Sequence, residues 1–177
     1  MLVVGLVSGG KDSLYNLVQC VAAGHELVCL ANLRPEGNSV EQEQDSHMYQ
    51  TVGWDCVDIL AKAMRLPLYV ESIKGESREV GMNYLPTDGD EVEDLFRLLE
   101  KVSRETGAKG VAVGAILSDY QRVRVESVCL RLGLTPLAYL WQRDQSELLE
   151  EMVMVGMESV LVKVACMGLD ERHLGKT

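Results

Sequence analysis

The chain has 177 residues, of which 47% are hydrophobic and 25% charged, and its formal net charge is −10. This composition is typical of one globular domain over residues 1–177 and excludes a collagen, a coiled-coil rod and a disordered tail. The acidic balance argues against stable nucleic-acid binding, because cationic side chains are needed to neutralise phosphates. The longest apolar runs, such as residues 111–117, are shorter than the ~18 residues of a membrane helix, so we expect no membrane association.

Strand-like and helix-like patterns alternate along the sequence. Short apolar runs predict strands over residues 2–7, 27–33, 68–73, 110–114, 136–140 and 159–165. Apolar stripes at helical spacing predict helices over 11–23, 47–65, 90–105, 118–132 and 146–155. Residues 74–88 form the least regular segment, which predicts a mobile surface loop. The alternation predicts an α/β fold: a three-layer sandwich with a mostly parallel, Rossmann-like sheet and helices on both faces.

The five cysteines are widely spaced, odd in number and without a Cys-x-x-Cys pair. Each falls in an apolar stretch, which predicts buried thiols in a reducing cytosol and a cytoplasmic protein. These cysteines are Cys20, Cys29, Cys56, Cys129 and Cys166.

A glycine-containing hexapeptide joins the first predicted strand to the first predicted helix. Two glycines allow a tight turn, and the helix N-terminus supplies free amides and a partial positive charge. A lysine and two serines add a full charge and hydroxyl donors, so the segment suits a polyphosphate. Its residues are Ser8, Gly9, Gly10, Lys11, Asp12 and Ser13.

Two phosphate-loop patterns compete for this segment. Gly5 and the Gly10-Lys11 pair fit a Walker A loop, but Asp12 replaces the Ser or Thr that would hold magnesium. Gly5 also falls inside the predicted strand. The shorter loop resembles instead the pyrophosphate loop (PP-loop) of the N-type ATP pyrophosphatases, which cleave ATP between its α and β phosphates.

Four carboxylates crowd the start of the helix predicted from residue 90. One interpretation is structural: Asp90 is an N-cap and Glu93 closes a capping box. The other is a carboxylate pair that holds ammonium or magnesium, and a capping turn could serve both. The four residues are Asp90, Glu91, Glu93 and Asp94.

Polar residues also follow the strand predicted over 110–114. Gly114 would let a ligand approach the strand end, and Ser118 can cap the next helix. Our hypothesis is that the side chains of residues 119–122, including Asp119 and Arg122, face an acceptor carboxylate or the α-phosphate, since Arg suits bidentate contact with either. An exposed ion pair between Arg122 and Glu126 is the alternative.

Four further segments extend the resemblance over essentially the whole chain. They are residues 89–95 (Gly-Asp-Glu-Val-Glu-Asp-Leu), 114–122 (Gly-Ala-Ile-Leu-Ser-Asp-Tyr-Gln-Arg), 124–126 (Arg-Val-Glu) and 139–143 (Tyr-Leu-Trp-Gln-Arg). Together they resemble the diphthine–ammonia ligase family. The resemblance implies an adenine nucleotide α-hydrolase-like fold and an ATP-dependent ligase. Such an enzyme activates the carboxylate of diphthine on translation elongation factor 2 as an acyl-adenylate, and ammonium then gives the amide, AMP and pyrophosphate.

The resemblance also implies roles for particular residues. Lys11 would stabilise the leaving pyrophosphate, and Asp12 would orient Mg²⁺. Asn32, at the end of the second strand, would neighbour the adenine, although an ordinary loop asparagine is an equal alternative. Trp141 could wall the site or pack in the core. The family pattern continues into a Glu-Gly-Gly-Glu motif that this sequence lacks, so the domain is expected to be truncated at its C-terminal side.

Two other functions compete with the ligase. The first is a tRNA-modifying PP-loop ATPase, which would favour a basic face and, in thiolating members, spaced cysteine pairs. The second is a short form that binds ATP without catalysis. Net charge and scattered cysteines count against the first alternative, and the missing motif favours the second.

Overall fold

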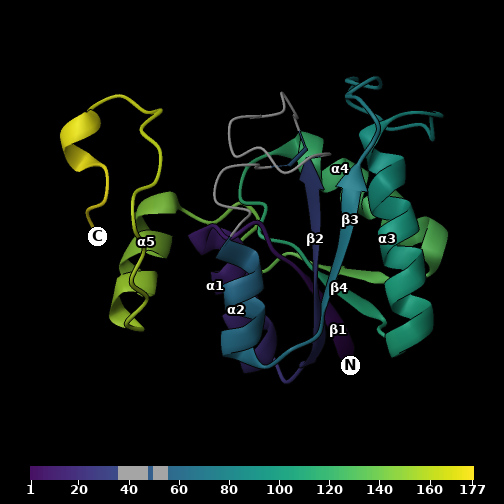
Figure 1. The fold of residues 1–177 in the computed structure, drawn as a ribbon, viewed down its shortest axis with the longest axis horizontal. Coiled ribbons are helices and arrows are strands. Elements are labelled where there is room, and N and C mark those ends of the chain that lie inside the picture. Colours follow the sequence, from purple (N-terminus) through teal and green to yellow (C-terminus); the bar gives the residue numbers. More distant parts are fainter. Residues whose placement is uncertain (36–47, 50–55) are drawn as a thin grey trace. The chain divides into compact units, whose positions relative to one another are not determined.

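The computed structural model describes residues 1–35, 48–49 and 56–177. In this part of the chain strands and helices alternate, as Figure 1 shows. The strands are β1 (Leu2–Leu6), β2 (Glu26–Pro35), β3 (Leu68–Ile73), β4 (Gly110–Ala112) and β5 (Thr135–Leu137). The helices are α1 (Lys11–Ala22), α2 (Val57–Met64), α3 (Glu91–Thr106), α4 (Asp119–Leu132) and α5 (Gln145–Met154), with a 3-10 turn over Glu171–His173. The chain forms two compact units, residues 1–142 and 143–177, which are described separately.

The sheet belongs to the first unit and is parallel throughout. Its strand order is β3-β2-β1-β4-β5, with Gly5 of β1 opposite Leu30 of β2 on one side and Ala112 of β4 on the other. The order therefore changes direction between β1 and β4. Open parallel sheets bind ligands beyond the carboxyl ends of the strands at such a switch point. The hexapeptide of residues 8–13 follows β1 at this place.

Two apolar clusters cover the two faces of the sheet. Alternate residues of β1 point to opposite sides: Val3 packs in a cluster with Leu17 of α1, and Val4 packs in a cluster with Leu95 of α3. Helices α1 and α2 thus lie on one face, and α3 and α4 lie on the other (Figure 1). This arrangement confirms the predicted three-layer α/β fold.

The two helices of the second face have the ends that their sequences favour. Asp90 caps α3 by accepting a hydrogen bond from an amide of the first turn, and Ser118 does the same for α4. Gly107 and Gly133 end these helices with φ of 72° and 65°, a left-handed conformation that glycine adopts without a steric penalty.

The predictions for two segments need correction or limitation. Residues 159–165 do not form the predicted strand: the amide of Leu161 bonds to the carbonyl of Lys176, and no ladder joins this segment to the described strands. A run rich in valine favours a strand only where a partner strand is available. Of the predicted helix over 47–65, α2 forms the C-terminal half, and residues 47 and 50–55 lie outside the described residues.

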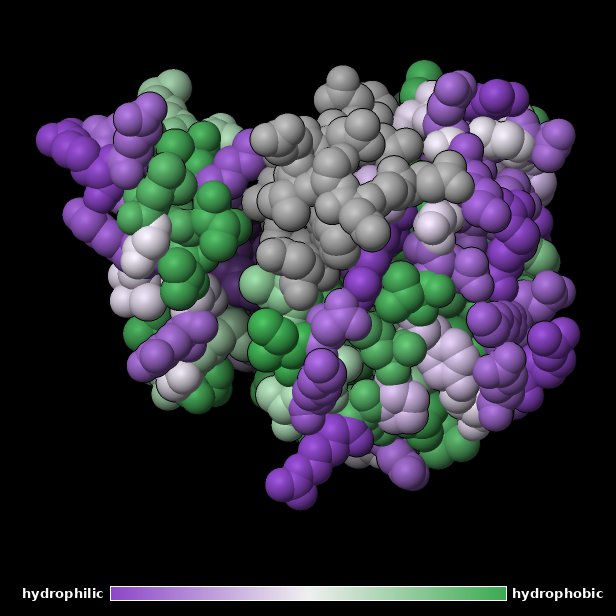
Figure 2. Space-filling model, in the orientation of Figure 1, coloured by the Kyte–Doolittle hydropathy of each residue, from purple (hydrophilic) through white to green (hydrophobic). Residues whose placement is uncertain are grey.

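The second unit consists of α5 and the segment that follows it. Asp144 caps α5 by accepting from the amides of Ser146 and Glu147 at 2.9 and 3.0 Å. Figure 2 shows hydrophobic side chains on the surface of this unit. Val153 and Met154 of α5 are 66% and 77% exposed. The expectation of a single domain over 1–177 stays a prediction.

The cysteines divide into two groups. Burial raises the pKa of Cys20 and Cys29 to about 11 and that of Cys129 to about 12, so these thiols stay protonated near neutral pH. Cys56 and Cys166 are exposed, so the prediction of burial is wrong for them. A cysteine in an apolar stretch is buried only when that stretch packs.

Among the described helices none is long and apolar enough to cross a membrane.

Candidate functional site

The loop of residues 8–13 is closed by its own serines. Gly9 has φ of 86°, which glycine tolerates. The hydroxyl of Ser13 donates to the carbonyl of Gly10 at 2.8 Å and accepts from the amide of Ser8 at 3.4 Å. The hydroxyl of Ser8 accepts from the amide of Gly10 at 3.3 Å. Both hydroxyls therefore shape the loop in this conformation.

The position of Gly5 argues against the Walker A pattern. Gly5 is paired on both sides inside β1, and a Cβ at this position would lie 2.7 Å from the side chain of Leu17. Its role is thus to let α1 pack closely on the strand. The loop starts after β1, so Gly5 is not part of it. That the loop binds pyrophosphate stays a prediction.

Lys11 and Asp12 are the first two residues of α1. Gly10 is the N-cap of α1. Because glycine has no side chain, no capping hydrogen bond from this residue offsets the partial positive charge of the helix N-terminus. The Lys11 ammonium lies 2.7 Å from the Asp12 carboxylate, and the two side chains are 41% and 36% exposed. Among the described residues no group of three or more His, Cys, Asp or Glu could hold a metal ion.

Gly114 brings the end of β4 against this helix start. A Cβ at Gly114 would lie 2.7 Å from the backbone of Ser13 and 2.8 Å from that of Asp12. The space that was expected to admit a ligand is therefore filled by the first turn of α1. Direct contact between Gly114 and a nucleotide stays a prediction, but its packing role is established.

Asn32 holds the residue that leads into the loop. Its side chain is 5% exposed, and its Nδ2 donates to the carbonyl of Val7 at 2.7 Å. Its Oδ1 accepts from Nε of Arg34 at 2.9 Å, and Arg34 in turn pairs with Asp58. Asn32 thus positions the end of β1, and contact with an adenine stays a prediction.

Asp90 and Asp94 fasten the segment between β3 and α3. Asp90 accepts from the amide of Val92 at 2.9 Å and from the amides of residues 78 and 79 at 3.0 and 2.8 Å. Asp94 accepts from the amides of residues 74 and 75, both at 2.8 Å. The predicted N-cap at Asp90 is confirmed, and the carboxylates also tie the predicted surface loop to α3.

Glu91 and Glu93 point to different partners. Glu91 is only 1% exposed and accepts from the hydroxyl of Ser77 at 2.6 Å. Glu93 accepts from the hydroxyl of Tyr84 at 2.8 Å and forms two hydrogen bonds with Arg131, at 2.7 and 2.8 Å. Arg131 holds the pKa of Glu93 below its ordinary value. The predicted capping box is therefore wrong, because Glu93 turns to Arg131.

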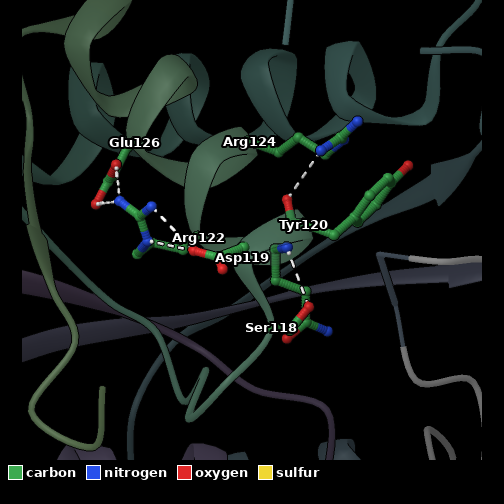
Figure 3. A network of polar contacts seen from close by, with 7 residues as sticks. Ser118, Asp119, Tyr120, Arg122, Arg124 and Glu126 are labelled. Atoms are coloured by element: carbon green, nitrogen blue, oxygen red, sulfur yellow. Dashed lines mark hydrogen bonds and ion pairs between the residues drawn. The ribbon is translucent and has the colours of Figure 1, made fainter. Parts of the chain in front are cut away.

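The first turn of α4 places Arg122 between two carboxylates (Figure 3). Its guanidinium lies 3.0 Å from Asp119 and 2.9 Å from Glu126, and these bonds raise its pKa. The guanidinium also lies over the ring of Trp141, 5.0 Å from its centroid. The ion pair that was the structural alternative is thus formed, and Asp119, Arg122 and Trp141 are brought together. Whether they face an acceptor stays a prediction.

Sequence reasoning missed two buried polar residues. Asn16 of α1 is fully buried: its Nδ2 donates to the carbonyl of Leu137 at 2.9 Å, and its Oδ1 accepts from the amide of Tyr139 at 2.9 Å. Asn16 thereby satisfies backbone groups at and just beyond the end of β5. Its place on the same helix face as Leu17 and Cys20 was the available signal. The second missed residue is Arg124, in α4.

These features define a class of protein: a Rossmann-like α/β domain with a glycine-rich loop after the first strand, at the switch point of the sheet. Residues 1–136 match the family model described as diphthamide synthase N-terminal domain. The chain is 60% identical to the diphthine–ammonia ligase of Danio rerio, over all of this chain and 70% of the relative. Identity is 56% to that of Homo sapiens, covering 67% of it, and 46% to that of Saccharomyces cerevisiae, covering 28%. The chain therefore belongs to the diphthine–ammonia ligase family.

Proposed function

We propose that this chain binds ATP at the loop of residues 8–13 and acts as a ligase. Its acceptor would be the diphthine carboxylate of translation elongation factor 2, and ammonium would supply the nitrogen. The relatives named diphthine–ammonia ligase support the reaction. The observation that supports nucleotide binding is the loop itself. It lies at the switch point of the sheet, between the buried strand β1 and the start of α1, which no side chain caps.

The residues of the loop fit a departing pyrophosphate. Gly9 and Gly10 let backbone amides approach a ligand, and the helix end favours negative charge. Lys11, 41% exposed, can exchange its contact with Asp12 for a phosphate oxygen. Such a group stabilises charge that develops on the leaving group.

A single carboxylate is enough for the magnesium ion that accompanies ATP. Mg²⁺ is commonly held by one or two carboxylates together with substrate phosphates and water. Asp12 is the carboxylate at the loop, and its exposed side chain fits this role. The ion would screen the phosphate charges during nucleotide cleavage.

The proposed reaction has two steps. A carboxylate oxygen of the acceptor attacks the α-phosphorus of ATP, and pyrophosphate leaves. Ammonia, formed by loss of a proton from ammonium, then attacks the acyl carbon, and AMP leaves. Arg122 is our candidate to hold the acceptor carboxylate or the α-phosphate, because its planar guanidinium suits both. Either anion would then compete with Asp119 and Glu126 for Arg122.

One assay tests the proposal. The chain is incubated with ATP, Mg²⁺, ammonium and diphthine-bearing elongation factor, and AMP and the amide are measured, with elongation factor that lacks diphthine as the control. We expect AMP and amide in equal amounts only with the modified factor. ATP binding without AMP release would instead favour the nucleotide-binding short form. AMP formation that depends on tRNA would favour the tRNA-modifying ATPase.

A further inference from the structure

Among the residues that the structure describes, Arg124 has the largest fully buried side chain. It lies in α4 and points away from Arg122 (Figure 3). Its guanidinium donates to the carbonyl of Tyr120 at 3.1 Å, to that of Gly81 at 3.1 Å and to that of Glu79. Its Cζ lies 3.3 Å from the centroid of the Tyr120 ring. Within the described ranges no carboxylate pairs with Arg124, and its Nε has no hydrogen-bond partner.

Stability alone gives a poor reason for an arginine at this place. A buried charge is costly to desolvate, and apolar residues of similar volume are often as stabilising as a buried ion pair. Arginine differs from an apolar residue in its geometry, because a rigid planar fork directs several donors at once. Here the fork joins three carbonyl groups from two separate segments.

The segment that Arg124 holds does not fix itself by burying its own side chains. Val80 is 61% exposed and Met82 is 89% exposed. The backbone of this segment is instead held by hydrogen bonds from side chains of two helices. The carboxylate of Asp90 in front of α3 accepts from the amide of Glu79, and Arg124 of α4 donates to the carbonyl of the same residue.

We propose that Arg124 is a positioning residue for the acceptor side of the site. It locks the segment of residues 79–81 against the first turn of α4, the turn that carries Asp119 and Arg122, and so keeps Arg122 aimed at the acceptor. This inference rests on the proposed function. It predicts that loss of Arg124 slows acyl transfer and leaves nucleotide binding at the loop of residues 8–13 unchanged.

The test compares Arg124→Met with wild type by hydrogen exchange and by kinetics. Met keeps much of the volume and removes the donors. We expect the amides of residues 79–83 to exchange at least about tenfold faster. The kcat of AMP formation should fall about 10- to 100-fold, because a displaced catalytic group costs this much, with the Kd of ATP unchanged. Wild-type exchange together with wild-type kcat would overturn the proposal.

Two further variants make the test decisive. Arg104→Met removes the same charge from the last turn of α3 and should match wild type in both measurements. Arg124→Lys keeps the charge, but a single ammonium cannot place donors on all three carbonyls. The kcat of Arg124→Lys should lie between those of wild type and Arg124→Met. If Arg124→Met does not fold, the comparison of Arg124→Lys with wild type tests the proposal. Full recovery by Lys would also overturn the proposal. If wild type forms no AMP, the proposed function fails, and hydrogen exchange alone still decides whether Arg124 holds residues 79–81.

Discussion

Replacing Gly114 by alanine should push the glycine loop away from the end of β4. The added Cβ would lie 2.7 Å from Cα and N of Ser13, whereas ordinary contact begins at 3.4 Å. The atoms that it meets are backbone, so no flexible side chain can swing aside. The start of α1 must therefore move by about 0.7 Å, or the strand must yield by the same amount.

The size of the effect follows from this displacement. An extra carbon in a packed site costs about 1–3 kcal/mol, so the free energy of unfolding should fall by this amount. A displacement approaching 1 Å can slow catalysis by about 100-fold, and the displaced backbone includes Asp12, next to Lys11. ATP affinity should fall together with turnover, because the loop binds the nucleotide in our proposal.

The assay combines urea unfolding, ATP titration and AMP release. Gly133→Ala is the matched control: its φ of 65° makes alanine unfavourable by about 1–2 kcal/mol, while nothing lies within 4 Å of the new Cβ. The control should lose stability and keep its ATP affinity. Wild-type stability, affinity and turnover in Gly114→Ala would refute the contact between β4 and the loop.

Three other changes have specific expected results. Lys11→Ala should lower turnover about 100- to 1000-fold in a pyrophosphate-release assay, since it removes a charge stabiliser. Asn16→Leu should cost about 2–4 kcal/mol in urea unfolding, because the carbonyl of Leu137 and the amide of Tyr139 lose their partner. The pKa of Glu93 is lowered from 4.5, so its carboxylate stabilises the fold above that pH, and this contribution is lost as the pH falls through the lowered pKa. Glu93→Gln should therefore cost about 1–2 kcal/mol at pH 7 and progressively less as the pH falls below 4.5.

Each of these results has a contradicting outcome. Turnover of Lys11→Ala equal to that of Lys62→Ala, a surface lysine of α2, would remove the role given to the loop lysine. An Asn16→Leu variant as stable as wild type would mean that water replaces the amide. A cost of Glu93→Gln that grows at acid pH would reverse the assigned direction of the pKa shift.

The described strands and helices of residues 1–142 could be predicted from the sequence because local residue patterns determine them. Alternation of buried strands and amphipathic helices predicted the layers, and Asp90 and Ser118 predicted two helix starts. The glycine loop was equally local. Its six residues are contiguous, so strand, turn and helix could be read together.

The hydrogen-bond partners of the polar side chains could not be predicted from the local sequence. Nothing near Asp94 in the sequence shows that it accepts amides from residues 74 and 75, and Arg124 bonds to carbonyls more than 40 positions away. The predicted strand over 159–165 failed for the same reason, since a strand depends on a distant partner. Gly114 was predicted from the sequence to admit a ligand, and only the fold shows that the backbone at the start of α1 lies against it.

The fastening of the segment between β3 and α3 has a consequence for its response to salt. Asp90 and Arg124 are buried and bond to neutral backbone groups, whereas Arg122, Asp119 and Glu126 form ion pairs partly open to solvent. Dissolved ions weaken exposed ion pairs as the screening length falls from about 8 Å at physiological ionic strength to about 3 Å at 1 M salt, and they affect buried charges far less. Rising salt should therefore weaken the ion pairs of Arg122 at lower concentrations than it weakens the hydrogen bonds that hold residues 79–81. The two sides of one helix turn thus differ in their sensitivity to salt.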